Sequence, residues 1–591
     1  MKNVISIVLD AFCYNNLEKK IGDLEITPFI NKLCKESITF TNIYSQAPYT
    51  EAAHIALLGG ENTLEEGGYL FGNATTRNSV LKSYKKAGYH TILGYSPYVC
   101  SKAYLKGATE YKYTRLFSIQ PCFDYRFNYF REKKIQCKFC EDYYLTCFKI
   151  LDEAFETWIK QCNSLIDKDP KSDMIYQFIK DINTIMNVRN ELYEQLHLYE
   201  NDKKNYIDNI FRQWKSHKLI ELNKIYNDRK EIQILETLKE LYTSKLLNYQ
   251  KNYERQVLRN NKLSLKYIMN MLWSNKDKKD WLRTIRNYFS FKKNKDIENY
   301  LNLINPETKC EVSLQVMIDT FFKDIKKYDE MNENYFLYFQ PQEFHLPSLF
   351  HSFDINDIQT VKNEFDIAFS LLDRIDNSYK GNIIADLSAR FCDYKIECFY
   401  NKLKNELKND FIFVITADHG YPSYYNPPRP IIYNQTYTEA FHIPFIIHNL
   451  QSSPEVKTGL FSILDGIELL KQKAGISDSE NIQERDFILC EYAGPGCPMI
   501  NEKKIWYTYI DKKLKLSAEV KLNETAKKED IINIFDIENN PEQTLNLRTR
   551  KRGNSINIIL NRITDRSKYL GAKLGVEGYL YNTINLINYN E

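Results

Sequence analysis

The 591-residue chain lacks several features that would each indicate a class of protein. No apolar run approaches the roughly 20 residues that a helix needs to cross a bilayer, so we expect no transmembrane segment. The formal net charge is only +3, and no nucleic-acid motif accompanies the basic stretches, so nucleic acid is not an expected partner. The 13 cysteines are odd in number and scattered, which indicates reduced thiols and not a disulfide scaffold.

We also expect no secretory leader. The first apolar strand is expected to begin at about the third residue, and its short apolar run ends in an acidic residue. Together with the scattered cysteines, this pattern predicts a cytoplasmic protein. No sequence pattern predicts the oligomeric state.

Two apolar runs near opposite ends of the chain each stop at an acid. Residues 4–12 read VISIVLDAF and end at Asp10, whereas residues 411–420 read FIFVITADHG and end at Asp418 and His419. Continuous β-branched runs are typical of buried parallel strands, and the carboxyl ends of such strands form the ligand-binding edge of an α/β sheet. We therefore expect these three side chains to meet at one edge.

A third segment adds a hydroxyl group and a second imidazole. Residues 46–60 read QAPYTEAAHIALLGG, in which Thr50 is expected to cap a helix and His54 to lie one turn further on. Asp10, Thr50, Asp418 and His419 would offer three hard oxygens and one imidazole, a set that suits a divalent cation. Such a cation would acidify the threonine hydroxyl and make it a nucleophile.

The order of these blocks resembles the alkaline phosphatase superfamily, and within it the sulfatase-like branch. The resemblance extends to QEFHLP at residues 342–347, TEAFHIPFIIH at 438–448 and IFDIENNPEQTLNL at 534–547, the last being similar to the sulfatase C-terminal signature. It implies an α/β fold with a mixed sheet sandwiched by helices and a small C-terminal α+β subdomain. Because this superfamily splits both sulfate and phosphate esters, fold alone does not settle the substrate.

Three departures from the sulfatase pattern bear on the chemistry. The nucleophile column, where sulfatases carry a Cys or Ser that becomes formylglycine, holds Thr50, which resembles the members that pass through a phospho-threonine intermediate. Sulfatases usually open with paired aspartates, but here Ala11 follows Asp10. Their lysine and arginine columns fall on Asn434 and His442, so the pocket has less fixed positive charge. We expect Mn, Zn or Mg rather than Ca.

The remaining histidines have competing interpretations. His345 falls in the column that contacts the ester oxygens, which implies substrate binding or leaving-group protonation, although it could be a surface residue in a Pro-bounded loop. His54 could act as acid or base or be a helix residue facing solvent. His442 could bind substrate or a second metal, or be a half-buried strand residue. Glu343 and His345 are only two residues apart, not four as in two-metal relatives, so we expect one ion.

The chain divides by composition into four parts. Residues 1–123 and 334–480 carry the motifs and form the predicted catalytic core, and residues 481–591 form the C-terminal subdomain. Residues 124–333 are rich in Lys, Glu, Asn and Tyr and have apolar residues at helical spacing, which predicts a helical insertion. Such an insertion could be a lid or an acceptor platform, or a dimerisation arm.

The favoured function is metal-dependent phosphoryl or phosphodiester transfer through phospho-Thr50. The expected partners are a small-molecule phospho-donor and a sugar or glycan acceptor, as in the modification of capsule or other surface polysaccharides. Hydrolysis of a small sulfate or phosphate ester is one alternative. A binding protein with a decayed site is the other.

Overall fold

The computed structural model describes most of the chain outside residues 113–313. The described residues are 2–66, 69–70, 73–74, 79–94, 107–112, 152, 159, 163, 175–201, 314–341, 343–344, 358–375, 379, 383–421, 436–449, 453–477, 482–493, 504–539, 543, 547 and 553–574. Two compact units are distinguished: Met1–Lys112 with Ser244–Glu298 and Ser313–Glu591, and Tyr113–Thr243 with Asn299–Val312. The four-part division expected from the sequence stays a prediction.

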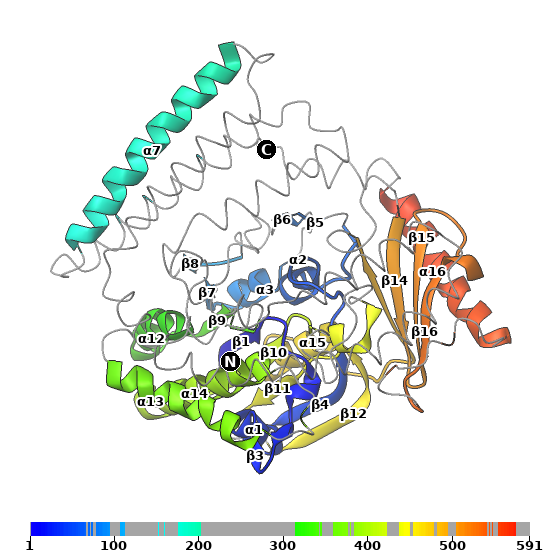
Figure 1. Cartoon of the computed structure of the whole chain (residues 1–591), viewed down its shortest axis with the longest axis horizontal. Coiled ribbons are helices and arrows are strands. Elements are labelled where there is room, and N and C mark those ends of the chain that lie inside the picture. Colours follow the sequence, from blue (N-terminus) through cyan, green and yellow to red (C-terminus); the bar gives the residue numbers. More distant parts are fainter. Residues whose placement is uncertain are drawn as a thin grey trace. The chain divides into compact units, whose positions relative to one another are not determined.

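An eight-stranded sheet forms the centre of the first unit (Figure 1). Its order is β12-β4-β11-β10-β1-β9-β7-β8, and every strand runs parallel to β1 except β11. The strands are β1 (Asn3–Leu9), β4 (Ile38–Tyr44), β7 (His90–Gly94), β8 (Glu110–Lys112), β9 (Tyr335–Phe339), β10 (Phe411–Ala417), β11 (Phe445–His448) and β12 (Glu455–Ser462). All residues of β1 and all but the first of β10 are buried, which is why their sequences are mainly apolar.

Helices cover both faces of this sheet. On β9, Phe336 stacks on Tyr84 of α3 with ring centroids 4.1 Å apart, whereas Phe339 meets Phe399 of α14 at 6.1 Å. Since positions three apart in a strand point to opposite faces, α3 and α14 lie on opposite sides. The helices of the core are α1 (Pro28–Lys35), α3 (Val80–Lys86), α12 (Leu314–Glu330), α13 (Ile358–Phe369), α14 (Ile383–Glu406) and α15 (Ile463–Ala474).

Shorter elements complete the core. After β4 come the short helix α2 (Thr50–His54) and one π-helical turn, η2 (Ile55–Gly59). The remaining pieces are η1 (Tyr14–Asn16), η6 (Ser370–Arg374), η9 (Thr438–Ala440), and the two-residue strand pairs β2 (Lys20–Ile21) with β3 (Leu24–Glu25) and β5 (Tyr69–Leu70) with β6 (Asn73–Ala74). Within the described ranges, no helix is both long and apolar enough to cross a membrane.

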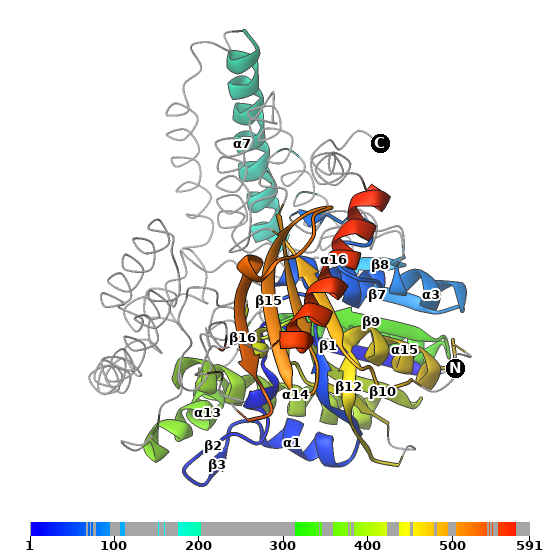
Figure 2. The ribbon, with the colours of Figure 1, turned by 90° about the vertical axis from the view of Figure 1, so that its right-hand side faces the viewer.

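A second, antiparallel sheet follows the core. Its strands pair in chain order, and α16 (Gly553–Leu574) runs alongside them (Figure 2). The strands are β13 (Ile488–Tyr492), β14 (Lys504–Ile510), β15 (Leu514–Lys521) and β16 (Ile531–Asp536), with η11 (Lys528–Asp530) before the last. Arg566 of α16 donates hydrogen bonds to the buried Glu491 of β13 and to Glu65 of the core. The fold class expected from the sequence is confirmed.

The second unit is described mainly through one helix, α7 (Ile175–Asn201), of 27 residues. Arg189 on α7 forms a forked pair with Asp152, with nitrogen–oxygen distances of 2.6 and 3.1 Å. A helix is what the spacing of apolar residues predicts here. Most of the predicted insertion at residues 124–333 lies outside the described residues.

Candidate active site

The carboxyl ends of β1 and β10 bring two acids together. Leu9 is level with Ala417 in the parallel register, so the next residues, Asp10 and Asp418, lie side by side at this edge. Both carboxylates are fully buried. Buried carboxylates that are this close repel one another unless a cation or several hydrogen-bond donors neutralise them.

Thr50 and His419 complete the cluster. The Thr50 Oγ1 lies 3.5 and 3.4 Å from the two carboxylate oxygens of Asp10 and 3.3 Å from His419 Nε2. These are long, weak contacts for a hydroxyl group. Tyr49, and not Thr50 as expected, is the N-cap; Thr50 is the first residue of α2, and its hydroxyl is directed to the acids instead of to the helix backbone. We call Asp10, Thr50, Asp418 and His419 the metal cluster.

Hydrogen bonds around the metal cluster orient His419 and Asp418. His419 Nδ1 lies 2.8 Å from the Gly420 carbonyl oxygen, which can only accept, so Nδ1 carries the proton and Nε2 presents a lone pair. Asp418 Oδ1 accepts from the backbone nitrogens of Ala11 and His419 at 3.1 and 2.7 Å. Asp418 Oδ2 is then the oxygen that faces His419 Nε2, at 3.7 Å. Ligands held in this way are typical of metal sites.

A divalent cation fits this set. Among the described residues, Asp10, Asp418 and His419 are the acids and histidine whose ligand atoms lie within 4.8 Å of one another. The hard oxygens and single imidazole suit Mn, Mg or Zn, and the cation would offset two buried negative charges. The four residues that the sequence predicts as ligands therefore meet, although their role as ligands stays a prediction.

The glycine of the DHG segment is required by a close approach of two backbones. The Gly420 nitrogen donates to the Ala440 carbonyl at 3.0 Å. A Cβ at Gly420 would lie 1.9 Å from the Glu439 carbonyl oxygen and 2.8 Å from Cys13 Sγ, which is sterically impossible without movement. The loop that carries Asp418 and His419 is thus fixed against the segment around η9.

One side chain of the site was not anticipated from the sequence. Gln340 directly follows β9 and is fully buried, and its Nε2 donates to Asp10 Oδ2 at 2.9 Å and to Asp418 Oδ2 at 3.0 Å. The next residue, Pro341, accepts a hydrogen bond from the Asp10 nitrogen at 3.3 Å. The signal was present, because Gln340 ends an apolar parallel strand as Asp10 and Asp418 do.

Comparison with known proteins decides the family. The model of the family described as Sulfatase matches residues 2–132 and 256–470, more than half of the chain. The chain belongs to the sulfatase family. It is an enzyme of the alkaline phosphatase superfamily, whose metal-dependent members hydrolyse or transfer ester groups. No curated protein matches it.

Solved structures show distant similarity to this sulfatase-family chain. The lipoteichoic acid synthase LtaP from Listeria monocytogenes is 11% identical over 99% of this chain and 92% of its own, with a TM-score of 0.45. The phosphonate monoester hydrolase from Silicibacter pomeroyi is 11% identical over 97% and 96%, with a TM-score of 0.44. An alkaline phosphatase superfamily protein from Vibrio parahaemolyticus is 10% identical over 99% and 88%, with a TM-score of 0.41.

In this sulfatase-family site, both ring nitrogens of His54 are engaged by protein groups. Nδ1 lies 2.7 Å from the Thr50 carbonyl oxygen and therefore donates, and Nε2 then accepts from the Tyr338 hydroxyl at 2.8 Å. Burial lowers the pKa of His54, opposed by Asp418 and by the bond to Thr50. Because the His54 ring is neutral and both of its nitrogens make hydrogen bonds, we favour a role for His54 in positioning Thr50. Its role as acid or base stays a prediction.

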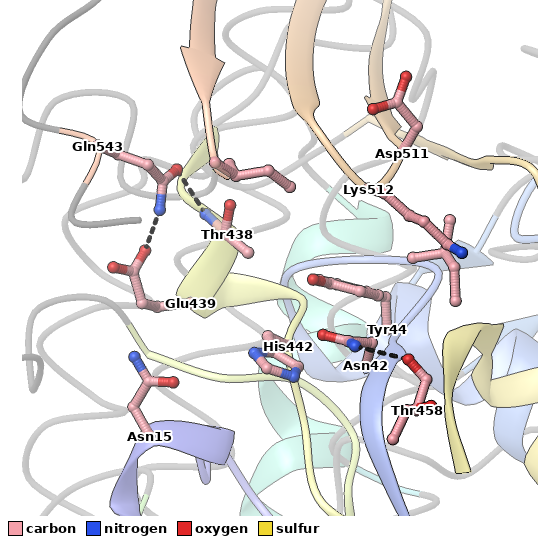
Figure 3. A pocket seen from close by; sticks show the side chains of 12 residues that line it. Asn15, Asn42, Tyr44, Thr438, Glu439, His442, Thr458, Asp511, Lys512 and Gln543 are labelled. Atoms are coloured by element: carbon pink, nitrogen blue, oxygen red, sulfur yellow. Dashed lines mark hydrogen bonds between the residues drawn. The ribbon is translucent and has the colours of Figure 1, made fainter. Parts of the chain in front are cut away.

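His442 lies apart from the metal cluster, beside a cavity of about 480 Å³ (Figure 3). Its ring is stacked between Tyr14 and Tyr44, and Nε2 donates to the Thr41 carbonyl at 2.9 Å. Burial lowers the pKa of His442 to about 4. We call this space the His442 cavity; it is lined by Asn15, Asn42, Tyr44, Thr438, Glu439, His442, Thr458, Leu460, Asp511, Lys512, Ile537 and Gln543.

The sulfatase-like C-terminal signature meets the core at this cavity. Gln543 accepts from the Thr438 nitrogen and donates to Glu439 Oε2, both at 3.0 Å. Glu439 is in turn the residue whose carbonyl lies against Cys13 and Gly420. The signature thereby supports the segment that backs the metal cluster.

Two predicted site residues, His345 and Asn434, lie outside the described residues. Of the pair considered for a second metal, Glu343 is described, and its Oε1 accepts from the Leu314 nitrogen at the start of α12 at 2.6 Å. Substrate roles for His345, Asn434 and His442 therefore stay predictions.

Proposed function

We propose that this sulfatase-family enzyme transfers a phosphoryl or phosphodiester group through a covalent phospho-threonine on Thr50. The observation that carries the proposal is the position of an unmodified threonine hydroxyl against Asp10 and His419, both of which are cation ligands by chemistry. A threonine cannot form the aldehyde hydrate of a sulfatase, but it can attack phosphorus as a nucleophile.

The first half of the reaction forms one bond and breaks one. Thr50 Oγ1 attacks phosphorus in line, the bond between phosphorus and the leaving oxygen breaks, and the hydroxyl proton passes to Asp10, whose carboxylate oxygens lie 3.4 and 3.5 Å from Oγ1. When bound, the divalent cation supplies positive charge that acidifies the hydroxyl and offsets charge on the phosphoryl oxygens. We assign protonation of the leaving oxygen to His345, with Asn434 as a further substrate contact.

In the second half, an acceptor hydroxyl attacks the same phosphorus, the bond between phosphorus and Thr50 Oγ1 breaks, and the proton of the acceptor hydroxyl restores the Thr50 hydroxyl group. A sugar hydroxyl gives transfer, and water gives hydrolysis. We place the remote part of the acceptor in the His442 cavity, because its lining offers amide, hydroxyl and carboxylate groups from both sheets, a mixture that suits a polyhydroxylated molecule. The buried Thr438 Oγ1 there has no hydrogen-bond partner in the described part of the protein, which supports a ligand or water at this place.

We further propose that the donor is a small phospho-compound, that the acceptor is a sugar or glycan and that the product modifies a capsule or other surface polysaccharide. A cytoplasmic location belongs to the same proposal and is supported by free thiols at Cys13, Cys34, Cys392, Cys398 and Cys490. Sulfate monoester hydrolysis is the rival activity, and Thr50 counts against it.

The test compares wild type, Thr50→Ala and Thr508→Ala, the last removing a buried threonine of the C-terminal sheet. Each protein is stripped of metal, reloaded with Mn²⁺ and given aryl phosphodiesters, phosphomonoesters and sulfates, with intact-mass analysis of the quenched protein. We expect phosphoester turnover and a mass adduct for wild type and Thr508→Ala, and neither for Thr50→Ala.

Sulfate turnover that survives in Thr50→Ala would reject the nucleophile and the substrate class together. If the wild type binds no metal and turns over none of the esters, a binding protein with a decayed site is favoured. If the phosphoryl group stays on Thr50 in water and is released only when a sugar is added, transfer is supported over hydrolysis.

A further inference from the structure

Within the described part of the chain, only the NH₂ half of the Gln340 side-chain amide makes hydrogen bonds of ordinary geometry. Its NH₂ group donates to both carboxylates of the metal cluster, at 2.9 and 3.0 Å. Its Oε1 is buried and makes no hydrogen bond of ordinary geometry to a described residue, although the Gln340 side chain is close enough to His54 to raise the pKa of that ring slightly against the lowering by burial. An orphaned buried carbonyl oxygen costs on the order of 1–3 kcal/mol, so this orientation is the less satisfied one unless the carboxylates demand it.

The two carboxylates account for this orientation. Asp10 and Asp418 are both fully buried, and the Gln340 NH₂ is the donor that bridges them. Two adjacent negative charges favour the nitrogen end of an amide over its oxygen end. A cation between the carboxylates reverses this preference, and a half-turn about the last side-chain bond exchanges the two ends within the same volume.

The backbone on either side of the amide does not move in this exchange. The Phe339 position is paired in the sheet with β1 and β7, and the Pro341 carbonyl accepts from the Asp10 nitrogen. Gln340 is thus anchored beside the end of β1, which carries Asp10. The exchange is confined to one terminal amide.

We propose that Gln340 turns its oxygen to the cation and acts as a fifth protein ligand, which makes the site selective for Mn²⁺ over Zn²⁺. Asp10, Thr50, Asp418 and His419 alone provide four ligands, the number that Zn²⁺ prefers. A fifth ligand that is a hard amide oxygen favours ions of higher coordination number, such as Mn²⁺. This inference rests on the metal site of the proposed function but not on which ester is processed.

The experiment measures affinity for metal and not activity. Metal-free wild type, Gln340→Leu and Gln340→Glu are titrated with Mn²⁺ by electron paramagnetic resonance and with Zn²⁺ by calorimetry against a competing chelator. Gln46→Leu is the matched control, because Gln46 is also buried with an unpartnered Oε1 but donates to Ser462, outside the metal cluster. Gln340→Met repeats the test should the Leu variant fail to fold.

We expect Gln340→Leu to weaken Mn²⁺ binding by at least about tenfold and Zn²⁺ binding by less than about threefold, a change in selectivity that a ligand produces. Gln340→Glu, which keeps an oxygen at this place, restores Mn²⁺ binding, and Gln46→Leu changes neither affinity. If Gln340→Leu weakens the binding of Mn²⁺ and Zn²⁺ equally, the proposal is overturned and Gln340 only orients the carboxylates as a hydrogen-bond donor. A wild type that binds neither metal would overturn both this inference and the proposed function.

Discussion

The metal cluster and the His442 cavity lie at the same edge of the main sheet but are built in different ways. The cluster is formed where neighbouring parallel strands end, and its acids and imidazole are buried against one another. The cavity is formed where β4 and β12 meet the second sheet, and its central ring, His442, is half-buried and uncharged. One region concentrates acids for chemistry, whereas the other offers a mixture of amide, hydroxyl and charged groups for recognition.

A single stretch of chain connects the two regions. The Glu439 carbonyl lies against Cys13 and Gly420 on the cluster side, while the Glu439 carboxylate accepts from Gln543 on the cavity side. A substitution can therefore affect one region alone or break the support that they share. The predictions below separate these cases.

The largest effect is expected from Asp418→Asn, which acts on the cluster alone. Asn keeps the shape but removes one of the two charges that hold the cation, and its NH₂ group can face His419 Nε2 in place of the metal. We expect turnover to fall by at least about 10³-fold and Mn²⁺ affinity by at least about tenfold. A stopped assay with saturating Mn²⁺ and calorimetry measure the two quantities, and retained Mn²⁺ affinity would contradict the assigned ligand.

Strand ends explain why the cluster could be predicted from the sequence and the cavity could not. Asp10, Asp418 and His419 follow apolar runs whose period and composition specify buried parallel strands, and parallel strands present their carboxyl ends at one edge. The same rule, applied to the run that ends at Gln340, would have completed the site. Nothing in the residues around Gln543 or Asp511 indicates that they face His442, because that contact depends on how two sheets pack.

The support shared by the two regions is tested by Gln543→Leu. The change removes the acceptor of the Thr438 nitrogen and one donor to the buried Glu439 carboxylate. We expect the free energy of unfolding to fall by about 1–3 kcal/mol, the cost of losing these two hydrogen bonds, one of them to a charged group. Denaturant melts measure it, with Gln46→Leu as the control for loss of a buried amide. A loss below 1 kcal/mol, on the order of one ordinary hydrogen bond, would show that the signature does not support the core.

We expect His442 to contribute to the pH dependence of the free energy of unfolding. Its folded-state pKa of about 4 lies below the value of about 6.5 in an unfolded chain, so as pH falls below 6.5 the unfolded state binds a proton that the folded state refuses. Between pH 7 and 5 this lowers the free energy of unfolding by about 2 kcal/mol.

His442→Phe keeps the stack between Tyr14 and Tyr44 but removes the titrating group. Its absolute stability is lower because the Thr41 carbonyl loses a donor, so the readout is the difference between pH 7 and pH 5. We expect this difference to shrink by about 2 kcal/mol relative to wild type. His197→Gln, on the exposed surface of α7, is the control variant. An unchanged difference in His442→Phe would mean that the ring is protonated in the folded cavity.

Both regions contain a residue in the left-handed conformation that is not glycine, Ala11 with φ 62° and Gln543 with φ 50°. At Ala11 the turn directs the backbone nitrogen to Asp418 Oδ1, and the buried methyl group forms no hydrogen bond of the kind that the Gln543 side chain makes. A left-handed alanine costs roughly 1–2 kcal/mol. Glycine removes this strain, but the greater entropy of its unfolded chain cancels part of the gain in stability.

Ala11→Gly is therefore expected to raise the free energy of unfolding by up to about 1 kcal/mol, the smallest effect in this series. Denaturant melts of the metal-free protein measure it, and Ala518→Gly in β15, a buried strand residue that is not in the left-handed conformation, is the control that should destabilise. Because the Ala11 nitrogen still reaches Asp418, Mn²⁺ affinity should stay within about threefold of wild type. A destabilised Ala11→Gly with weakened Mn²⁺ binding would mean that the Ala11 methyl group, and not only the turn, holds Asp418 in place.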